Sequence, residues 1–179
     1  NTYTGNFIKA QKAIEKKFGN QVEFIPMFNV LEGNCENSLQ ILVDKKCDII
    51  FTTSYGYGDM AKEFAKKYPN IQFCHATGDN ANIEPFVPNY HTFMGRIYEG
   101  RYTAGVVAGL KLQELIDKEQ IKKEDALIGY VGAFPYAEVI SGFTAFFLGV
   151  QSVVPSSKMI VKYTNSWTDF VKEKNCTKE

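Results

Sequence analysis

The sequence has 179 residues, of which 45% are hydrophobic and 22% are charged, a composition typical of a globular protein. Its 20 basic and 20 acidic side chains cancel, which argues against a protein that binds nucleic acid through charge. No apolar run approaches the roughly 20 residues that a membrane-spanning helix needs.

Helical and strand-like patterns alternate along the chain. The first predicted elements are a helix over 7–18, a strand over 22–25, a helix around 39–43, a strand over 48–53, a helix over 60–68 and a strand over 71–75. A strand over 92–94, a helix over 98–116, a strand over 127–131, a helix reaching Val150 and a strand over 159–163 follow. Asn34 or Asn37 could cap the helix around 39–43. This alternation predicts an α/β fold with parallel sheets and helices on both faces.

Three stretches carry a more specific expectation. The run 48–53 is continuously strand-like, so we expect it to be buried on both faces. The helix over 98–116 has a smooth face that includes Gly105 and Gly109, which we expect to pack closely on a sheet. The charged stretch 117–125 is the predicted domain boundary.

Four turns follow the predicted strands, and the carboxyl ends of parallel strands form the edge where α/β proteins bind ligands. The first turn, 52–58, carries hydroxyl groups that could hold a polar ligand, or could cap the next helix through Thr53 or Ser54. The second contains His75 and Asp79. A lone histidine at a strand end is more often structural than catalytic.

The other two turns carry aromatic side chains. Phe134, in the third turn, could stack on a planar ligand or pack in the core. The fourth turn holds Trp167, the only tryptophan, beside Asn165 and Ser166. Trp167 could be a hydrophobic staple, and Ser166 or Thr168 could cap the next helix. A tryptophan beside amide and hydroxyl groups nevertheless favours a site for a planar ligand.

The four cysteines and two histidines do not form a metal-binding pattern. Cys47 and Cys74 lie in or beside strand-like runs and are expected to be buried free thiols. No serine or cysteine nucleophile with a partnered aspartate is recognisable. From the sequence we therefore expect a protein that is not an enzyme and that binds neither a metal ion nor a cofactor.

Five segments together resemble the basic membrane protein family. They are residues 49–57, 65–78, 95–109, 128–135 and 165–169, and they match the family in order and spacing. Members of that family are solute-binding lipoproteins of ABC importers, and characterised members bind purine nucleosides or bases.

The resemblance implies a type I periplasmic-binding-protein fold, in which two Rossmann-like lobes close on a ligand that lies between them. It places residues 1–124 in the first lobe and residues 125–179 at the start of the second. In the family, the first strand and a lipidated cysteine would precede Asn1, and the rest of the second lobe would follow Glu179. The chain is therefore expected to be a fragment of a longer protein.

By family position, eight residues are expected to bind the ligand. They are Tyr3, Thr53, Ser54 and Tyr55 in the first lobe and Phe134, Asn165, Ser166 and Trp167 in the second. Tyr3 belongs to the segment 1–4, which would reach the ligand from the first strand. The expected ligand is a purine nucleoside or base, and the expected partners are the permease and the ATPase of an importer. The expected location is outside the cytoplasm, on the cell membrane, through a lipid anchor that is not part of this chain.

Two alternative functions have different signatures. A ligand-sensing regulator of the same fold would carry a basic helix-turn-helix ahead of Asn1, whereas a lipobox cysteine there would exclude it. An α/β enzyme acting on nucleosides would need a paired acid and nucleophile, for which His75 and Asp79 are the nearest candidates.

Overall fold

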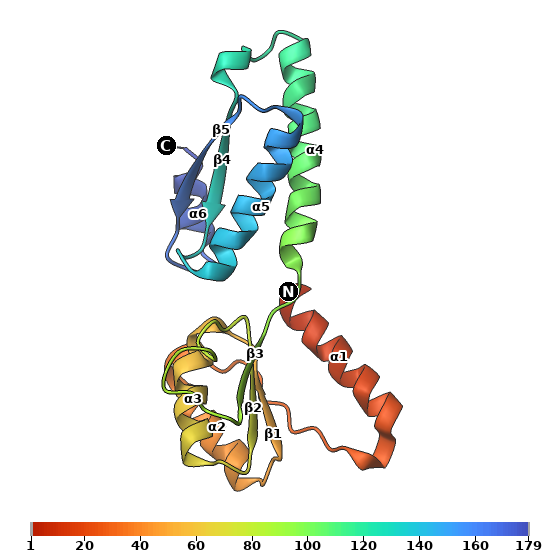
Figure 1. The fold of residues 1–179 in the computed structure, drawn as a ribbon, viewed down its shortest axis with the longest axis vertical. Coiled ribbons are helices and arrows are strands. Elements are labelled where there is room, and N and C mark those ends of the chain that lie inside the picture. Colours follow the sequence, from red (N-terminus) through yellow and green to blue (C-terminus); the bar gives the residue numbers. More distant parts are fainter. Residues whose placement is uncertain (1, 179) are drawn as a thin grey trace. The chain divides into compact units, whose positions relative to one another are not determined.

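The computed structural model describes residues 2–178, with side chains from Tyr3 onward. The chain folds into two compact units, one that ends at Met94 and one that begins at Gly95 (Figure 1). Both are built on parallel strands with helices beside them, which confirms the predicted α/β class. The lobe boundary expected between residues 124 and 125 differs from this division, and it stays a prediction for the complete protein.

The first unit is a three-stranded parallel sheet with helices. Its described elements are α1 (Thr2–Phe18), α2 (Cys35–Asp44), β1 (Ile49–Thr52), α3 (Gly58–Lys67), β2 (Gln72–Ala76) and β3 (Tyr90–Phe93), with short 3₁₀ turns η1 (Gly19–Gln21), η2 (Glu32–Asn34) and η3 (Tyr55–Tyr57). The strand order is β1-β2-β3, and Ile50 lies opposite Phe73, which lies opposite Tyr90.

The core of the first unit lies on one face of this sheet. Ile50 and Phe73 are 2% and 0% exposed, and they pack with Leu39 of α2 and with Phe64 of α3. These apolar residues recur at strand and helix spacing because each element turns one side towards the same core.

The opposite face of β1 is not covered in the same way. Ile49 and Phe51 are 53% and 55% exposed, so the burial of the strand alternates along its length. The expectation that the strand over 48–53 is buried on both faces is therefore wrong. Helices α2 and α3 pack on the other face of the strand, and an apolar side chain is buried only where another element packs on it.

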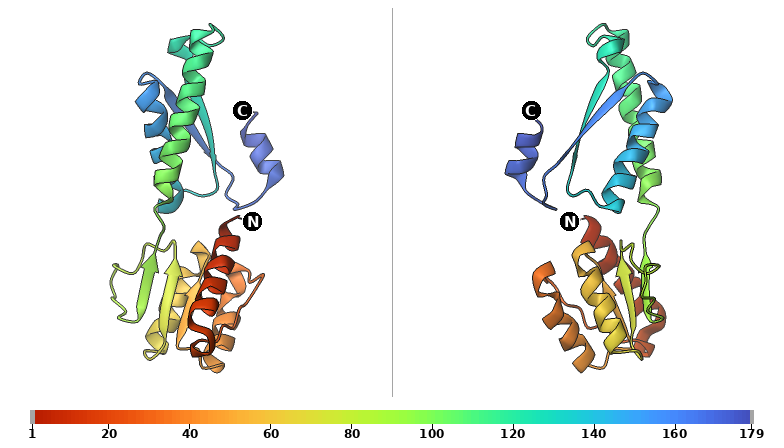
Figure 2. Two further views of the ribbon diagram at one scale, coloured as in Figure 1. Left: turned by 90° about the vertical axis from the view of Figure 1, so that its right-hand side faces the viewer. Right: turned by 60° about the vertical axis from the view of Figure 1, so that its left-hand side comes forward.

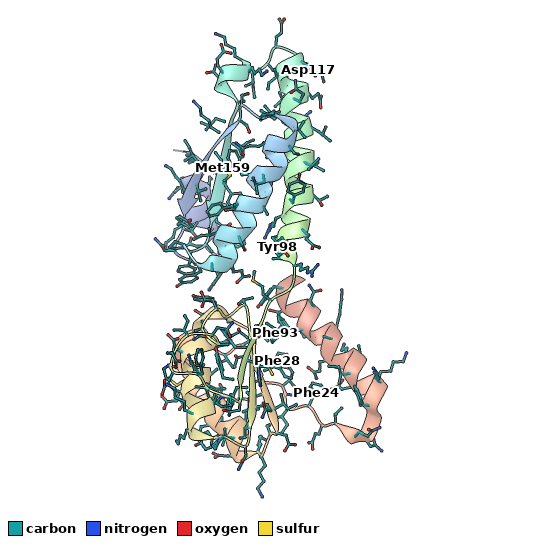
Figure 3. All side chains as sticks on the ribbon, in the orientation of Figure 1. Phe24, Phe28, Phe93, Tyr98, Asp117 and Met159 are labelled. Atoms are coloured by element: carbon teal, nitrogen blue, oxygen red, sulfur yellow. The ribbon has the colours of Figure 1, made fainter. Side chains whose placement is uncertain are left out.

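The predicted strand over 22–25 is also wrong. Residues 22–28 follow η1 without regular secondary structure, and Figure 3 labels Phe24 and Phe28 along this segment. A strand needs hydrogen bonds from a neighbouring strand, and the three-stranded ladder of the described residues does not include this segment. Phe28 is consequently 61% exposed.

Helix α1 confirms the helix predicted over 7–18 and begins earlier, at Thr2. Its apolar face is not buried, because Ile14 and Phe18 remain 38% and 40% exposed. Periodicity thus identified the helix, but it does not reveal whether another element packs on the apolar face.

Two buried polar side chains hold the long loop between β2 and β3. Lys62 of α3 is 7% exposed, and its Nζ donates to the carbonyl oxygens of Asn80 and Ile83 over 2.8 and 2.6 Å. Asn89 is 6% exposed, and its Nδ2 donates to the carbonyls of Ala65, Tyr68 and Ile71 at 2.7 to 3.1 Å. Such bonds satisfy backbone groups that a loop would otherwise leave unpaired. Lys62 thus fixes the start of the loop, after the carboxyl end of β2, and Asn89 fixes its end, beside the amino end of β2.

The second unit pairs two parallel strands with two long helices. Its described elements are α4 (Ile97–Asp117), η4 (Lys123–Asp125), β4 (Leu127–Gly132), α5 (Ala137–Val153), β5 (Lys158–Tyr163) and α6 (Phe170–Cys176). The ladder between β4 and β5 runs from Leu127 opposite Lys158 to Gly132 opposite Tyr163. Leu112 of α4 and Val150 of α5 are buried together in its core.

The glycine face of α4 packs on helix α5 and not on the sheet that we expected. A Cβ atom at Gly105 would overlap the carbonyl oxygen of Phe146, and one at Gly109 would lie 2.9 Å from the carbonyl oxygen of Val150. Gly149 of α5 has equally little room, since its Cβ would lie 2.8 Å from the backbone nitrogen of Val106. The two helix backbones touch because glycines stand on both sides of the contact.

The cysteines are free thiols in the described chain, but the burial prediction for two of them is wrong. Cys47 and Cys74 are half-buried, whereas Cys35, the first residue of α2, is buried. Burial raises the pKa of the Cys35 thiol, which lowers its reactivity. Cys74 is only half-buried because it lies on the less covered face of the sheet.

Candidate functional site

The first group of predicted residues lies at the carboxyl end of β1. Thr53, Ser54 and Tyr55 form the entry to η3 and α3, and all three are half-buried. Ser54 Oγ donates to Oε1 of Glu32 over 2.5 Å, and the N–H of Gly56 donates to the same oxygen over 3.0 Å. The turn is therefore organised around a carboxylate that the sequence analysis did not single out.

Tyr55 connects this turn to the one that follows β2. Its hydroxyl lies 3.4 and 3.5 Å from the two carboxylate oxygens of Asp79, which is a long contact for a hydrogen bond. Asn80, next to Asp79, donates from Nδ2 to Asp59 Oδ1 over 3.1 Å. Two neighbouring strand ends thus share one polar edge, as the parallel order predicts.

His75 is a structural residue of this edge. It is 1% exposed, its Nδ1 is hydrogen-bonded with Thr52 Oγ1 at 2.8 Å, and its ring stacks on that of Tyr90. Gly58 and Gly78 leave room for the imidazole, because Cβ atoms there would lie 2.9 and 3.1 Å from its Nε2. Burial keeps the His75 ring away from a ligand, whereas the Asp79 carboxylate is exposed beside the Tyr55 hydroxyl.

The burial of His75 predicts a loss of stability in acid. Burial lowers its pKa below 6.5, although hydrogen bonds that the ring donates to the backbone of Tyr55 and Thr52 oppose that shift. Below about pH 6.5 the unfolded chain binds a proton that the folded chain excludes, so stability falls as the pH drops, by at most about 1.4 kcal/mol per pH unit. Thermal unfolding of the intact protein between about pH 7.5 and 5.5 should show this slope.

The second histidine provides the control for this prediction. His75→Asn should flatten the dependence, whereas His91→Asn should keep it, because His91 is exposed and lies 2.9 Å from Gln72 Oε1. An unchanged slope in His75→Asn would assign the acid sensitivity to other groups.

Tyr3 lies in the first turn of α1. It is 38% exposed, and its ring meets that of Phe7 edge-on with centroids 5.1 Å apart. Within the first unit, α1 begins at the end towards which β1, β2 and β3 point (Figure 2). Tyr3 thus shares that end of the unit with Thr53, while Asn1 of the predicted segment 1–4 lies outside the described residues.

The second unit brings two of its predicted residues into contact. Phe134 follows β4 and Trp167 follows β5, and their rings meet edge-on with centroids 5.1 Å apart. Tyr136, which was not predicted, completes the group: it stacks on Phe134 at 4.9 Å and lies 6.1 Å from Trp167. We call these three residues the aromatic cluster. A signal for Tyr136 was present in the sequence, because it lies two positions after Phe134 in the same turn.

The aromatic cluster borders a hollow of about 300 Å³ at the carboxyl ends of β4 and β5. The hollow is lined by Val131, Gly132, Ala133, Thr164, Ser166, Trp167, Glu173 and Thr177. Trp167 belongs to both features and is 42% exposed. A ring with one side packed and another open offers the surface on which a planar ligand stacks.

Asn165 and Ser166 shape the backbone of this last turn. Asn165 has φ of +53°, a left-handed conformation that asparagine tolerates better than most residues. Ser166 Oγ donates to the carbonyl of Thr168 over 3.2 Å, and Thr164 Oγ1 donates to the carbonyl of Ser166 over 2.8 Å. These bonds present Trp167 at the tip of the turn.

The cap of α6 differs from the alternatives of the sequence analysis. Neither Ser166 nor Thr168 caps the helix. Asp169 does, since its Oδ1 accepts from the backbone nitrogens of Val171 and Lys172 over 3.1 and 3.0 Å. The hydrogen bond that the backbone N–H of Lys172 donates holds the pKa of Asp169 below its usual value. Trp167 packs on the rings of Phe134 and Tyr136.

Within residues 2–178, no cluster of three or more His, Cys, Asp or Glu side chains could hold a metal ion. Over the same part of the chain, no helix is both long and apolar enough to cross a membrane.

Known proteins resemble this chain over most of its length. Residues 3–179 match the Bmp family, "ABC transporter substrate-binding protein PnrA-like". A purine-binding protein of Brucella abortus is 36% identical over 171 residues, which cover 95% of this chain and 44% of that protein. A Haloferax volcanii protein that is provisionally named as an ABC transporter glucose-binding protein is 38% identical over 122 residues, 68% of this chain and 27% of that protein. The chain thus spans less than half the length of these relatives.

A solved structure shares the fold. An ABC transporter solute-binding protein from Aeropyrum pernix superposes with a TM-score of 0.63 at 18% sequence identity, over 81% of this chain and 39% of that one. At this identity the likeness concerns the fold alone.

Proposed function

The chain belongs to the Bmp family of PnrA-like ABC transporter substrate-binding proteins, and on that premise we propose that the intact protein delivers a purine nucleoside or nucleobase to an ABC importer. The partners in this role are a membrane permease and its ATPase. The protein works outside the cytoplasm, held at the membrane by a lipid anchor.

The aromatic cluster is the observation that best supports a purine as the ligand. Phe134, Tyr136 and Trp167 gather at the carboxyl ends of β4 and β5, where α/β sheets receive ligands. A purine is planar and aromatic, and it gains more from stacking on exposed rings than a sugar does. The purine-binding relative supports the same class, whereas the relative named for glucose supports a sugar.

Polar groups in both units suit the remaining edges of a nucleoside. Thr53 and Tyr55 lie at the end of β1, and Asn165 and Ser166 lie at the end of β5. Hydroxyl and amide groups donate and accept hydrogen bonds, which is what a base edge and a ribose require. We propose these residues, with Tyr3, Phe134 and Trp167, as the ligand-binding set.

Isothermal titration calorimetry on the intact protein tests the ligand class. We expect saturable binding of at least one of adenosine, guanosine, inosine, adenine and guanine, with Kd of about 1 μM or below, and no heat from glucose. Binding of glucose alone, or of none of these compounds, would contradict the proposal.

A regulator of the same fold is the second candidate, and the residues that precede Asn1 in the intact protein separate the two. A lipobox cysteine supports a transport role, and a basic helix-turn-helix supports regulation. An enzymatic role would show as free base released from a nucleoside during prolonged incubation.

A further inference from the structure

The turn after β1 is tied to an earlier segment through one carboxylate. Ser54 Oγ and the N–H of Gly56 both donate to Oε1 of Glu32, over 2.5 and 3.0 Å, although Ser54 and Glu32 are 22 positions apart. Close by, the Tyr57 hydroxyl donates to the carbonyl oxygen of Val30 over 2.6 Å. Residues 30–32 and 54–57 therefore hold each other in place.

Gly56 provides the space for this carboxylate. A Cβ atom at position 56 would lie 2.5 Å from Glu32 Oε2, closer than real contacts allow. The atoms it meets are the end of a flexible side chain, so an alanine there would displace the carboxylate and leave the backbone in place. Gly56 is also not among the residues with positive φ, so its backbone conformation accepts alanine.

We infer that Glu32 is a positioning residue for the ligand site, an inference that rests on the proposed function. Its carboxylate sets the backbone of the turn that carries Thr53 and Tyr55 by engaging one side-chain donor and one backbone donor. Hydrogen bonds to an ionised acceptor are stronger than those between neutral groups, so a half-buried carboxylate can hold such a turn.

This role reassigns Ser54. A serine hydroxyl has one proton, and Ser54 donates it to Glu32. Ser54 therefore has no proton left for a ligand, and it supports the turn instead. The hydroxyl that we assign to the ligand is that of its neighbour Thr53.

Four variants of the intact protein test the inference, with the purine compound that gives the largest heat as the probe. Glu32→Ala removes the acceptor, and Gly56→Ala displaces it while leaving the glutamate in the chain. Each should weaken binding about tenfold, or roughly 1.4 kcal/mol. The double variant should be no weaker than the worse single variant, because both changes remove the same contact. Glu32→Gln keeps an acceptor oxygen and should bind within about threefold of the unchanged protein.

Gly33→Ala is the matched control, since a Cβ atom there meets nothing within 4 Å. It should leave binding unchanged. Hydrogen exchange of the amides of residues 54–57 gives a readout that needs no ligand, and it should accelerate in Glu32→Ala and Gly56→Ala but not in Gly33→Ala. Thermal unfolding confirms that each variant is folded.

Three results would overturn the inference. Fast exchange in the turn with an unchanged Kd would show that the turn does not position the ligand. A loss in Glu32→Gln as large as in Glu32→Ala would make Glu32 a direct charged contact. A Ser54→Ala variant that loses more affinity than Glu32→Ala would return Ser54 to the ligand. If the unchanged protein binds no purine, the exchange data still decide whether Glu32 orders the turn, and the proposed function fails separately.

Discussion

Gly105→Ala is expected to destabilise the second unit by about 3 kcal/mol, the largest stability effect that we anticipate for a single methyl group. The added Cβ would overlap the carbonyl oxygen of Phe146, and it would also lie 3.1 Å from the Cα of Gly149. Both neighbours are backbone atoms of α5, so no side chain can rotate away, and the two helices must separate. Their separation would open the contact around buried Val150.

Gly100→Ala is the matched control in the same helix. A Cβ atom at Gly100 meets nothing within 4 Å, so alanine there should be neutral or should stabilise the helix by up to about 1 kcal/mol. Thermal unfolding of the intact protein measures both effects, and hydrogen exchange should locate the change in α4 and α5. Equal unfolding temperatures for Gly105→Ala and Gly100→Ala would show that these helices do not pack through glycine.

Trp167→Ala is expected to weaken ligand binding by about 5- to 150-fold while the protein stays folded. Stacking of a base on an aromatic side chain contributes about 1–3 kcal/mol, and Trp167 is the exposed member of the aromatic cluster. Calorimetry gives the affinity, and fluorescence adds a direct signal because the chain has one tryptophan. Ligand should shift its emission if the ring is stacked (any tryptophan elsewhere in the intact protein would first be replaced).

Phe170→Ala separates stacking from a general loss of aromatic surface. Phe170 lies close in sequence, at the start of α6, and is 80% exposed, but it is not part of the aromatic cluster. The Phe170→Ala protein should bind the ligand with an unchanged dissociation constant. If the Trp167→Ala protein keeps its dissociation constant and instead unfolds at a lower temperature, Trp167 is a packing residue. Phe134 and Tyr3 would then be the aromatic residues to test for stacking on the ligand.

Local patterns in the sequence predicted the fold class and most of the helices and strands, although residues 22–25 do not form the predicted strand. Helical spacing identified α1, α3 and α4, and the apolar runs identified β4 and β5, because the period of apolar residues reflects the geometry of each element. Alternation then implied parallel sheets, and parallel sheets place their carboxyl ends on one edge. For that reason Phe134 and Trp167 could be expected at the same edge from sequence alone, and the structure brings their rings together.

Only the tertiary structure decided which surfaces meet. The glycines of α4 could serve a helix or a sheet equally well, and only the position of α5 showed which. The strand-like run of β1 gave no sign that one of its faces stays open. Ser54 was expected to bind the ligand until the fold placed Glu32 against it. In each case the deciding partner is distant in sequence, so a pattern that records only local spacing carries no information about it.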